Sequence, residues 1–253
     1  NNMKNLYMRR LVLTALMVGI ICPALFADYT SKKNVTGNYE DPSMWSTQGN
    51  AQGSPPTNGN VDQALSIETG TIITRNGDFN PVTVMVSGKL IVKGNYTNNQ
   101  WGGVTVKKDA VLEIFGNLTA AANITVEGGG TLIVHGNLTS SNAGITSHGD
   151  IIVSGNFSTA SSTTVHNKGN LVVGGNFTHL GGGLNVNGDQ SDTKIYILNP
   201  DAEIIALTWS VVYEPGVVGN LDDFLKKEAG SLVDIVNDVI INVVIGYQWK
   251  TDV

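Results

Sequence analysis

Three side chains with complementary acid and base chemistry lie in the middle of the chain: Lys93, Glu113 and His135. A carboxylate, an imidazole and an ammonium group are groups that general acid–base catalysis uses. Lys93 and His135 occupy equivalent positions two repeats apart, roughly 10 Å at β-sheet spacing, with Phe115 between them. This arrangement suits neither a carboxylate pair for glycoside hydrolysis nor a base beside an activating cation. We therefore expect no catalytic residue and no enzymatic activity.

The histidines are the remaining candidates for metal binding, at His135, His148, His166 and His179. His148 and His166 fall at similar positions of neighbouring repeats, which could pair them. No cysteine and no acid accompanies them at a spacing typical of metal ligands. We expect solvated histidines in turns, and neither a metal site nor a cofactor.

Asparagine and threonine form the most regular polar pattern of the chain. The asparagines are Asn95, Asn117, Asn137, Asn156 and Asn176, and two residues after them stand Thr97, Thr119, Thr139, Ser158 and Thr178. Three interpretations are open. Each Asn can satisfy backbone groups at a turn and bond its equivalent one repeat away, about 4.8 Å distant, which is the favoured interpretation. The Asn-x-Thr/Ser sequences can also be glycosylation acceptors, or an exposed array that matches ice or a crystalline glycan.

These residues belong to a repeat of about 20 residues. The sequence TLIVHGNLT, ending at Thr139, has close copies on both sides, and its glycine falls at Gly94, Gly116, Gly136, Gly155 and Gly175. With a degenerate copy at Gly77, the intervals are 17, 22, 20, 19 and 20 residues. A period of this length is typical of a solenoid, in which each coil buries its apolar face against its neighbours.

Apolar residues at a spacing of two predict that the coils consist of β-strands. The inward columns are Leu90, Leu112, Leu132, Ile151 and Leu171; Val92, Ile114, Val134, Val153 and Val173; and Tyr96, Leu118, Leu138, Phe157 and Phe177. A leucine-rich repeat is the rival interpretation. It is disfavoured because the second half of each period reads VTV, ITV or TTV, which favours strand over helix. We predict an all-β, right-handed parallel β-helix.

One outward column is also apolar, at Ile91, Ile133, Ile152 and Val172, with Glu113 among them. An exposed stripe of this kind would be a sticky surface. Near the C-terminus, Leu221, Phe224, Leu225, Leu232, Ile235, Val236 and Val239 fall at helical spacing. We predict that the segment from Asn220 to Val239, a helix that Asn220 can cap, folds back over the apolar column. A strand is expected from Val239 to Trp249, with a longer helix as the alternative. The alternative is that the C-terminal segment only plugs the last coil and leaves the stripe free to bind a second subunit or a surface partner.

Four segments are expected along the chain. Residues 1–27 carry Lys4, Arg9 and Arg10 before an apolar run that ends in small residues, which predicts a cleaved secretory signal peptide. Residues 28–62 are expected to form an irregular cap, residues 63–200 the β-helix, and residues 201–253 a small strand-helix-strand segment. The mature chain is expected to have no transmembrane span. It is expected to be extracellular or on the cell surface, and the periplasm is an alternative location.

The distribution of charge argues against nucleic acid as a partner. The formal net charge is −6, and residues 188–253 contain eight Asp and three Glu against four Lys. From residue 61 to 187 the seven acids nearly balance the six bases. Phosphate binding needs clustered Lys and Arg, which this chain lacks.

The N-terminal part resembles a known group of proteins. Gly37 to Ser46 reads GNYEDPSMWS and Pro55 to Val61 reads PPTNGNV. The series is similar to the Gly-Asn-Trp, Asp-Pro-x-x-Trp-Ser, Pro-x-x-Gly-Asp-x-Val motif that opens many bacterial extracellular β-solenoid surface proteins and, loosely, G8-type domains. The resemblance covers about residues 37–187. Tyr39 replaces the usual first Trp and Asn60 the usual Asp.

This resemblance implies a capped, secreted β-helix with Trp45 packed over the open end of the first coil, and it brings no catalytic residue. We expect a secreted or cell-surface, non-enzymatic β-helix that acts as a structural or adhesive module, with glycans or other surface components as partners. The alternative is a polysaccharide-binding or polysaccharide-degrading β-helix, with ice binding as a minor one. The candidate interaction surface comprises Ile91, Ile133, Ile152, Val172, Thr97, Thr119, Thr139 and Thr178.

Overall fold

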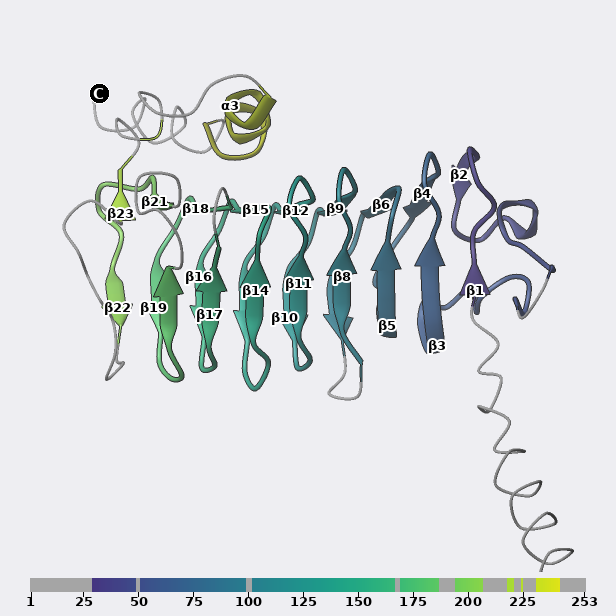
Figure 1. The fold of residues 1–253 in the computed structure, drawn as a ribbon, viewed down its shortest axis with the longest axis horizontal. Coiled ribbons are helices and arrows are strands. Elements are labelled where there is room, and N and C mark those ends of the chain that lie inside the picture. Colours follow the sequence, from purple (N-terminus) through teal and green to yellow (C-terminus); the bar gives the residue numbers. More distant parts are fainter. Residues whose placement is uncertain are drawn as a thin grey trace, which may run out of the picture.

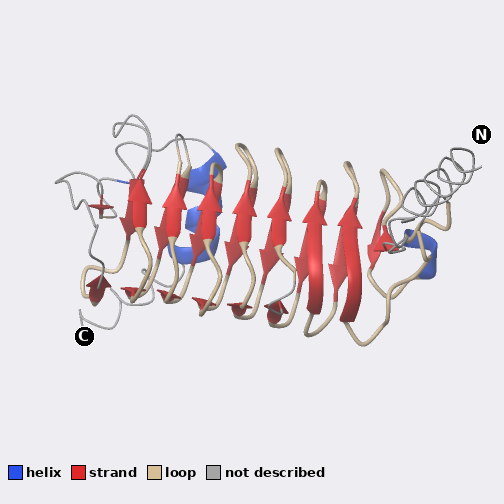
Figure 2. Ribbon diagram, turned by 60° about the horizontal axis from the view of Figure 1, so that its bottom comes forward, coloured by secondary structure: helices blue, strands red, loops and turns tan. Residues whose placement is uncertain are grey.

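The fold is a β-solenoid of stacked coils whose strands form three parallel sheets (Figures 1 and 2). The first two coils contribute strands to only two of these sheets. The structure is a computed structural model that describes residues 29–48, 51–98, 102–166, 169–186, 194–206, 218–220, 224 and 231–241. The prediction of a parallel β-helix with coils of about 20 residues is confirmed.

The three sheets run along the solenoid axis. The eight-stranded sheet contains β1 (Tyr29–Thr30), β3 (Asn60–Ile67), β5 (Asn80–Val86), β8 (Val104–Val106), β11 (Ile124–Val126), β14 (Ile145–Ser147), β17 (Thr163–Val165) and β20 (Leu184–Val186). The nine-stranded sheet contains β2 (Thr36–Asn38), β4 (Ile72–Arg75), β6 (Lys89–Val92), β9 (Val111–Ile114), β12 (Thr131–Val134), β15 (Asp150–Val153), β18 (Asn170–Val173), β21 (Lys194–Ile197) and β23 (Val218–Gly219). The six-stranded sheet contains β7 (Tyr96–Asn98), β10 (Leu118–Ala120), β13 (Leu138–Ser140), β16 (Phe157–Thr159), β19 (Phe177–His179) and β22 (Ile204–Ala206).

The inward columns form one continuous hydrophobic core. All fifteen residues of the three predicted columns are 1% exposed or less. Neighbouring coils are in register, so Leu132 lies between Leu112 and Ile151. The inward parity that strand alternation predicts is therefore confirmed.

The recurring Gly-Asn forms a ladder at the corner between the nine-stranded and six-stranded sheets. The side-chain oxygen of each Asn accepts a hydrogen bond from the backbone N–H of the next Asn, as from Asn137 N to Asn117 Oδ1 at 2.9 Å. Asp78 starts the ladder under Asn95, and Asn176 ends it by accepting from the N–H of Glu203 at 3.0 Å. A Cβ at Gly136 would lie 2.6 Å from the carbonyl oxygen of Gly116, which explains why glycine precedes each Asn. The predicted turn ladder is confirmed.

The N-terminal segment closes the first coil with aromatic residues. Trp45 is 1% exposed, and its Nε1 donates a hydrogen bond to the carbonyl oxygen of Tyr39 at 2.8 Å. The rings of Tyr39, Phe79 and Tyr96 continue the edge-to-face series into the core, with centroids 5.5 and 5.4 Å apart. This segment is less irregular than predicted, because β1 and β2 pair with β3 and β4, and a 3₁₀ turn, η1 (Pro42–Met44), precedes Trp45.

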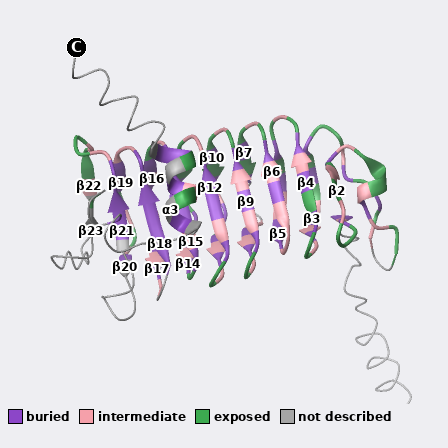
Figure 3. Cartoon of the chain, turned by 90° about the horizontal axis from the view of Figure 1, so that it is seen from above, coloured by how far each residue is buried: buried purple, intermediate pink, exposed green. Residues whose placement is uncertain are grey.

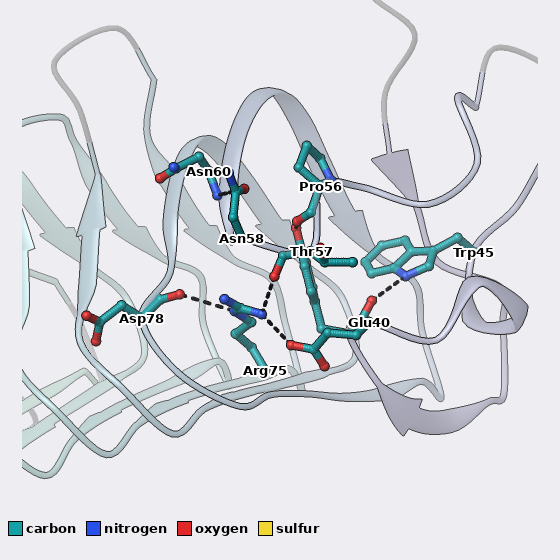
Figure 4. A network of polar contacts seen from close by, with 9 residues as sticks. Glu40, Trp45, Pro56, Thr57, Asn58, Asn60, Arg75 and Asp78 are labelled. Atoms are coloured by element: carbon teal, nitrogen blue, oxygen red, sulfur yellow. Dashed lines mark hydrogen bonds and ion pairs between the residues drawn. The ribbon is translucent and has the colours of Figure 1, made fainter.

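Arg75 fastens this cap to the first full coil (Figure 4). Its guanidinium forms an ion pair with Glu40 and donates to the carbonyl oxygens of Thr57 at 2.7 Å and Asp78 at 3.1 Å. The guanidinium also lies over the ring of Tyr39, 5.3 Å from its centroid. One buried cation thus joins three segments that are distant in sequence.

The C-terminal segment packs on the outside of the nine-stranded sheet (Figure 3). Helix α3 (Ser231–Val236) continues into a π-helix, η2 (Asn237–Ile241). Phe224, Leu232, Val236, Val239 and Ile240 form a second buried cluster with Ile133, Ile152, Val172, Tyr196 and Leu198. The predicted fold-back over the outward apolar column is therefore confirmed for the coils of β12 to β21.

One detail of the C-terminal prediction differs from the structure. The backbone N–H of the helical Phe224 donates to the carbonyl oxygen of Asn220 at 3.0 Å, as expected where the helix begins at Asn220. The predicted strand from Val239 to Trp249, however, is wrong for Val239 to Ile241, which are π-helical. β-branched residues also fit a buried helical face, and periodicity alone cannot separate the two in a short apolar run. The first strand expected in residues 201–253 corresponds to β22, and residues 207–217 and the signal peptide lie outside the described residues. Within the described residues, no helix is long and apolar enough to cross a membrane.

Candidate functional site

The structure brings the acid and base candidates together on the part of the nine-stranded sheet that the described C-terminal residues do not cover. Glu113, on β9, points outward between two coils. Its Oε2 pairs with Lys89 Nζ at 2.8 Å, and its Oε1 lies 3.2 Å from His135 Nε2. Lys89 was not singled out from the sequence, although it lies at the start of the adjacent strand β6, where its long side chain can reach Glu113.

Lys93, Phe115 and His135 form a stack beside this carboxylate. The repeat predicts this arrangement, because the three residues occupy equivalent positions of successive coils. Lys93 Nζ lies 3.5 Å from the Phe115 ring centroid, a cation–π contact. The rings of Phe115 and His135 are stacked with centroids 4.3 Å apart. Because Lys93 and His135 come from the coils before and after Phe115, they cover the two faces of its ring. Phe115 is 40% exposed but offers no free face on which a sugar ring could stack.

The electrostatics of this cluster favour a structural ion pair over proton transfer. The hydrogen bond from His135, helped by Lys89, lowers the pKa of Glu113 to about 2 against its burial. A carboxylate with this pKa is ionised at neutral pH and is a weak base, whereas a general acid or base works best with a pKa near the operating pH. The cluster therefore joins three coils through a bridged carboxylate.

This pKa predicts that Glu113 contributes acid-sensitive stability. The unfolded carboxyl titrates near 4.5 and the folded one near 2, so its contribution is complete above pH of about 4.5 and is lost as the pH falls toward 2. Glu113→Gln should therefore flatten the acid limb of a plot of unfolding midpoint against pH at constant ionic strength. The exposed Asp201→Asn is the control and should keep the wild-type slope. Identical acid limbs in wild type and Glu113→Gln would contradict the ion-pair assignment.

A shallow groove of about 470 Å³ lies next to the cluster, at the corner between the eight-stranded and nine-stranded sheets. Its lining comes from consecutive coils and includes Ile72, Lys89, Lys107, Lys108, Val111 and Glu127. Lys107 pairs with Glu127 at 2.6 Å, and Lys89 pairs with Glu113. Most of the charge in the groove is thus already compensated by neighbouring side chains.

Comparisons with protein-family models, with curated proteins and with solved structures yield no match. Function is therefore inferred from the side chains that this solenoid presents on its faces.

The outer face of the six-stranded sheet presents the predicted threonine column. Thr97, Thr119 and Thr139 are exposed, in direct register, and separated by one coil each. Ser158 and Thr178 continue the column and are half-buried. The exposed Asn ladder runs parallel to it, two residues earlier in each coil. Within the described part of the chain the hydroxyls of Thr97, Thr119 and Thr139 have no hydrogen-bond partner, so they are available to a ligand.

The apolar half of the predicted interaction surface needs correction. Ile133, Ile152 and Val172 are 5%, 0% and 0% exposed, because the C-terminal segment covers them. Only Ile91 lies outside that cover, and it is half-buried. These residues stabilise the fold-back and do not form a free surface in this structure.

The histidines do not share one environment, contrary to expectation. His179 points into the solenoid and is fully buried, and burial lowers the pKa of its imidazole. His148 and His166 stack at the corner between two sheets, and burial with the nearby His148 lowers the pKa of His166. Among the residues that the structure describes, no three His, Cys, Asp or Glu side chains converge in a way that could hold a metal ion.

Proposed function

We propose that this protein is an exported, non-enzymatic surface module that adheres to a repeating polymer, of which a cell-surface glycan is the leading example. The observation that carries the proposal is the column of exposed hydroxyls at Thr97, Thr119 and Thr139, fixed at one-coil spacing. A periodic ligand can contact such a column at equivalent groups. The signal-like sequence of residues 1–27 and the resemblance to extracellular β-solenoid proteins support export.

Rigidity supports this role. The inner strands of this face, from β10 to β19, are hydrogen-bonded to both neighbouring coils, and the Asn ladder fixes the corner beside them. Since the threonines lie on a preorganised sheet, binding a polymer would order few protein side chains, which lowers the entropic cost of association.

The proposal is tested with a glycan array probed with residues 28–253 of the wild type and of two triple variants. Thr97→Val, Thr119→Val and Thr139→Val together remove three hydroxyls with little change of shape. If each hydroxyl contributes about 1 kcal/mol, binding should weaken by roughly 100-fold.

The matched control is Thr105→Val, Thr125→Val and Thr146→Val. These threonines form an equivalent outward column of the eight-stranded sheet, in register on successive coils. The control should bind like wild type. Equal losses in both variants, or no binding of any polymer by the wild type, would refute the proposed face.

The second candidate function is binding or cleavage of a polysaccharide in the corner groove. The groove favours it because Lys89, Lys107 and Lys108 line a hollow to which consecutive coils contribute. In that case Lys108→Ala should weaken binding while the threonine variants do not. Turnover of a bound polymer would exclude the non-enzymatic role.

A further inference from the structure

A column of titratable side chains runs along the corner between the eight-stranded and nine-stranded sheets. It consists of the residues that follow β8, β11, β14 and β17, which are Lys107, Glu127, His148 and His166. The backbone N–H of each donates to a carbonyl oxygen one coil earlier, as from His148 to Val126 at 2.7 Å and from His166 to Ser147 at 2.6 Å. The four side chains therefore leave the backbone at fixed, equivalent positions.

The two histidines of this corner column face each other. Their ring centroids are 4.0 Å apart and their planes differ by 4°. His148 is exposed and His166 is half-buried, so solvent reaches the pair. Glu127 precedes His148 by one coil, about 4.8 Å along the axis. An acid thus lies beside the two histidines in the fold. The sequence does not show this directly, because Glu127, His148 and His166 are 18 to 39 residues apart.

We propose that His148 and His166 bind a divalent transition-metal ion that prefers imidazole, Zn²⁺ or Cu²⁺, with Glu127 as the third ligand. An imidazole nitrogen binds zinc through a lone pair that lies in the plane of the ring, at about 2.0–2.1 Å. Because the two rings are parallel, both side chains must rotate until one nitrogen of each points to the same ion. The terminal torsion of a histidine side chain has a broad energy well, and the exposed His148 has room to turn. Water would complete the coordination.

The parallel orientation of the two rings and the position of Glu127 together explain why three ligands do not converge in the structure. Its carboxylate is turned to Lys107, with Nζ and Oε1 2.6 Å apart. Lys107 and a metal ion therefore compete for the same carboxylate. The removal of Lys107 should strengthen metal binding, an effect that a purely structural histidine stack would not show.

Packing alone is the competing explanation of the histidine pair. Phe157 and Phe177 stack across coils inside the solenoid, with centroids 5.2 Å apart, as do Phe115 and His135 outside it. The corner column differs from both, since two imidazoles and a carboxylate follow one another along a solvent-accessible edge. Residues of these types are preferred ligands of zinc and copper.

The test is a calorimetric titration of Zn²⁺ into metal-free residues 28–253 without a histidine tag. One equivalent should bind. His148→Ala and His166→Ala should each weaken binding by at least about tenfold, because even the outer-shell partners of metal ligands contribute that much. His135→Ala is the matched control and should bind like wild type. Lys107→Met should bind more tightly, and Glu127→Gln more weakly.

Electron paramagnetic resonance with Cu²⁺ gives a second readout. The wild-type spectrum should show coupling to two imidazole nitrogens, and each single histidine variant should show coupling to one. The site assignment is overturned if neither ion binds, if several equivalents bind weakly, or if the variants at 148 and 166 bind like wild type. Unchanged affinity in Lys107→Met and Glu127→Gln would remove Glu127 as a ligand. None of these outcomes depends on the adhesive role.

Discussion

Leu132→Ala is expected to lower the free energy of unfolding by about 2–5 kcal/mol. Leu132 is fully buried in the inward column, directly between Leu112 and Ile151 of the neighbouring coils. The cavity cannot collapse easily, because hydrogen bonds on both sides hold adjacent coils at a fixed spacing of about 4.8 Å. The loss should appear in the midpoint of a guanidinium titration followed by circular dichroism.

Thr139→Ala, in the same coil, is the control for this substitution. Thr139 is exposed on the outer face of β13, so its replacement should change stability by less than about 0.5 kcal/mol. Similar losses in the two variants would mean that the inward and outward parities are not distinguished energetically, and would contradict the assigned core.

The sequence predicts the solenoid well because the rules that define it are local. Strand alternation places Leu132 inside and Thr139 outside without knowledge of any distant residue. A repeat then stacks equivalent positions, so the Asn ladder and the column of Lys93, Phe115 and His135 follow from the period alone. The fold-back of the C-terminal segment could be predicted because the sheet and the helix each have an apolar face without a partner. Packing the two faces together removes both from water.

The errors of prediction come from positions where local polarity conceals burial. His179 continues an inward column that includes the apolar Ala120. Its equivalents Asn98, Ser140 and Thr159 are polar, which hides the parity of the column. Asn98, Ser140 and Thr159 bond the backbone inside the corner, as Ser140 does by donating to the carbonyl oxygen of Ala143 at 2.7 Å. The buried ring nitrogens of His179 have no such partner among the described residues. Similarly, the pairing of Glu113 with Lys89 depends on side-chain conformation across a diagonal of the sheet, which a period does not specify.

The second large effect is expected where the C-terminal segment meets the sheet. Ile152 is fully buried beneath it and belongs to the cluster that includes Val236 and Ile240. Ile152→Gln would lose about 1.5–3 kcal/mol of apolar burial and would leave an amide without partners, at a further cost of about 1–3 kcal/mol. We expect residues 231–241 to detach while the coils stay folded. Ile152 points away from the inward core, so its side chain does not contribute to the packing inside the solenoid.

Hydrogen exchange resolves this outcome by region. Amides of residues 231–241 should lose protection in Ile152→Gln, while those of β9 to β18 stay protected, since local opening costs less than global unfolding. The matched control is Ile91→Gln, the same change in the same outward column, where the C-terminal segment does not reach. It should leave residues 231–241 protected.

Detachment should also expose Ile133, Val172 and Tyr196, and this apolar stripe should then promote self-association in sedimentation experiments. If the variant instead unfolds as a whole, or keeps full protection at residues 231–241, the segment is not an independently displaceable cover.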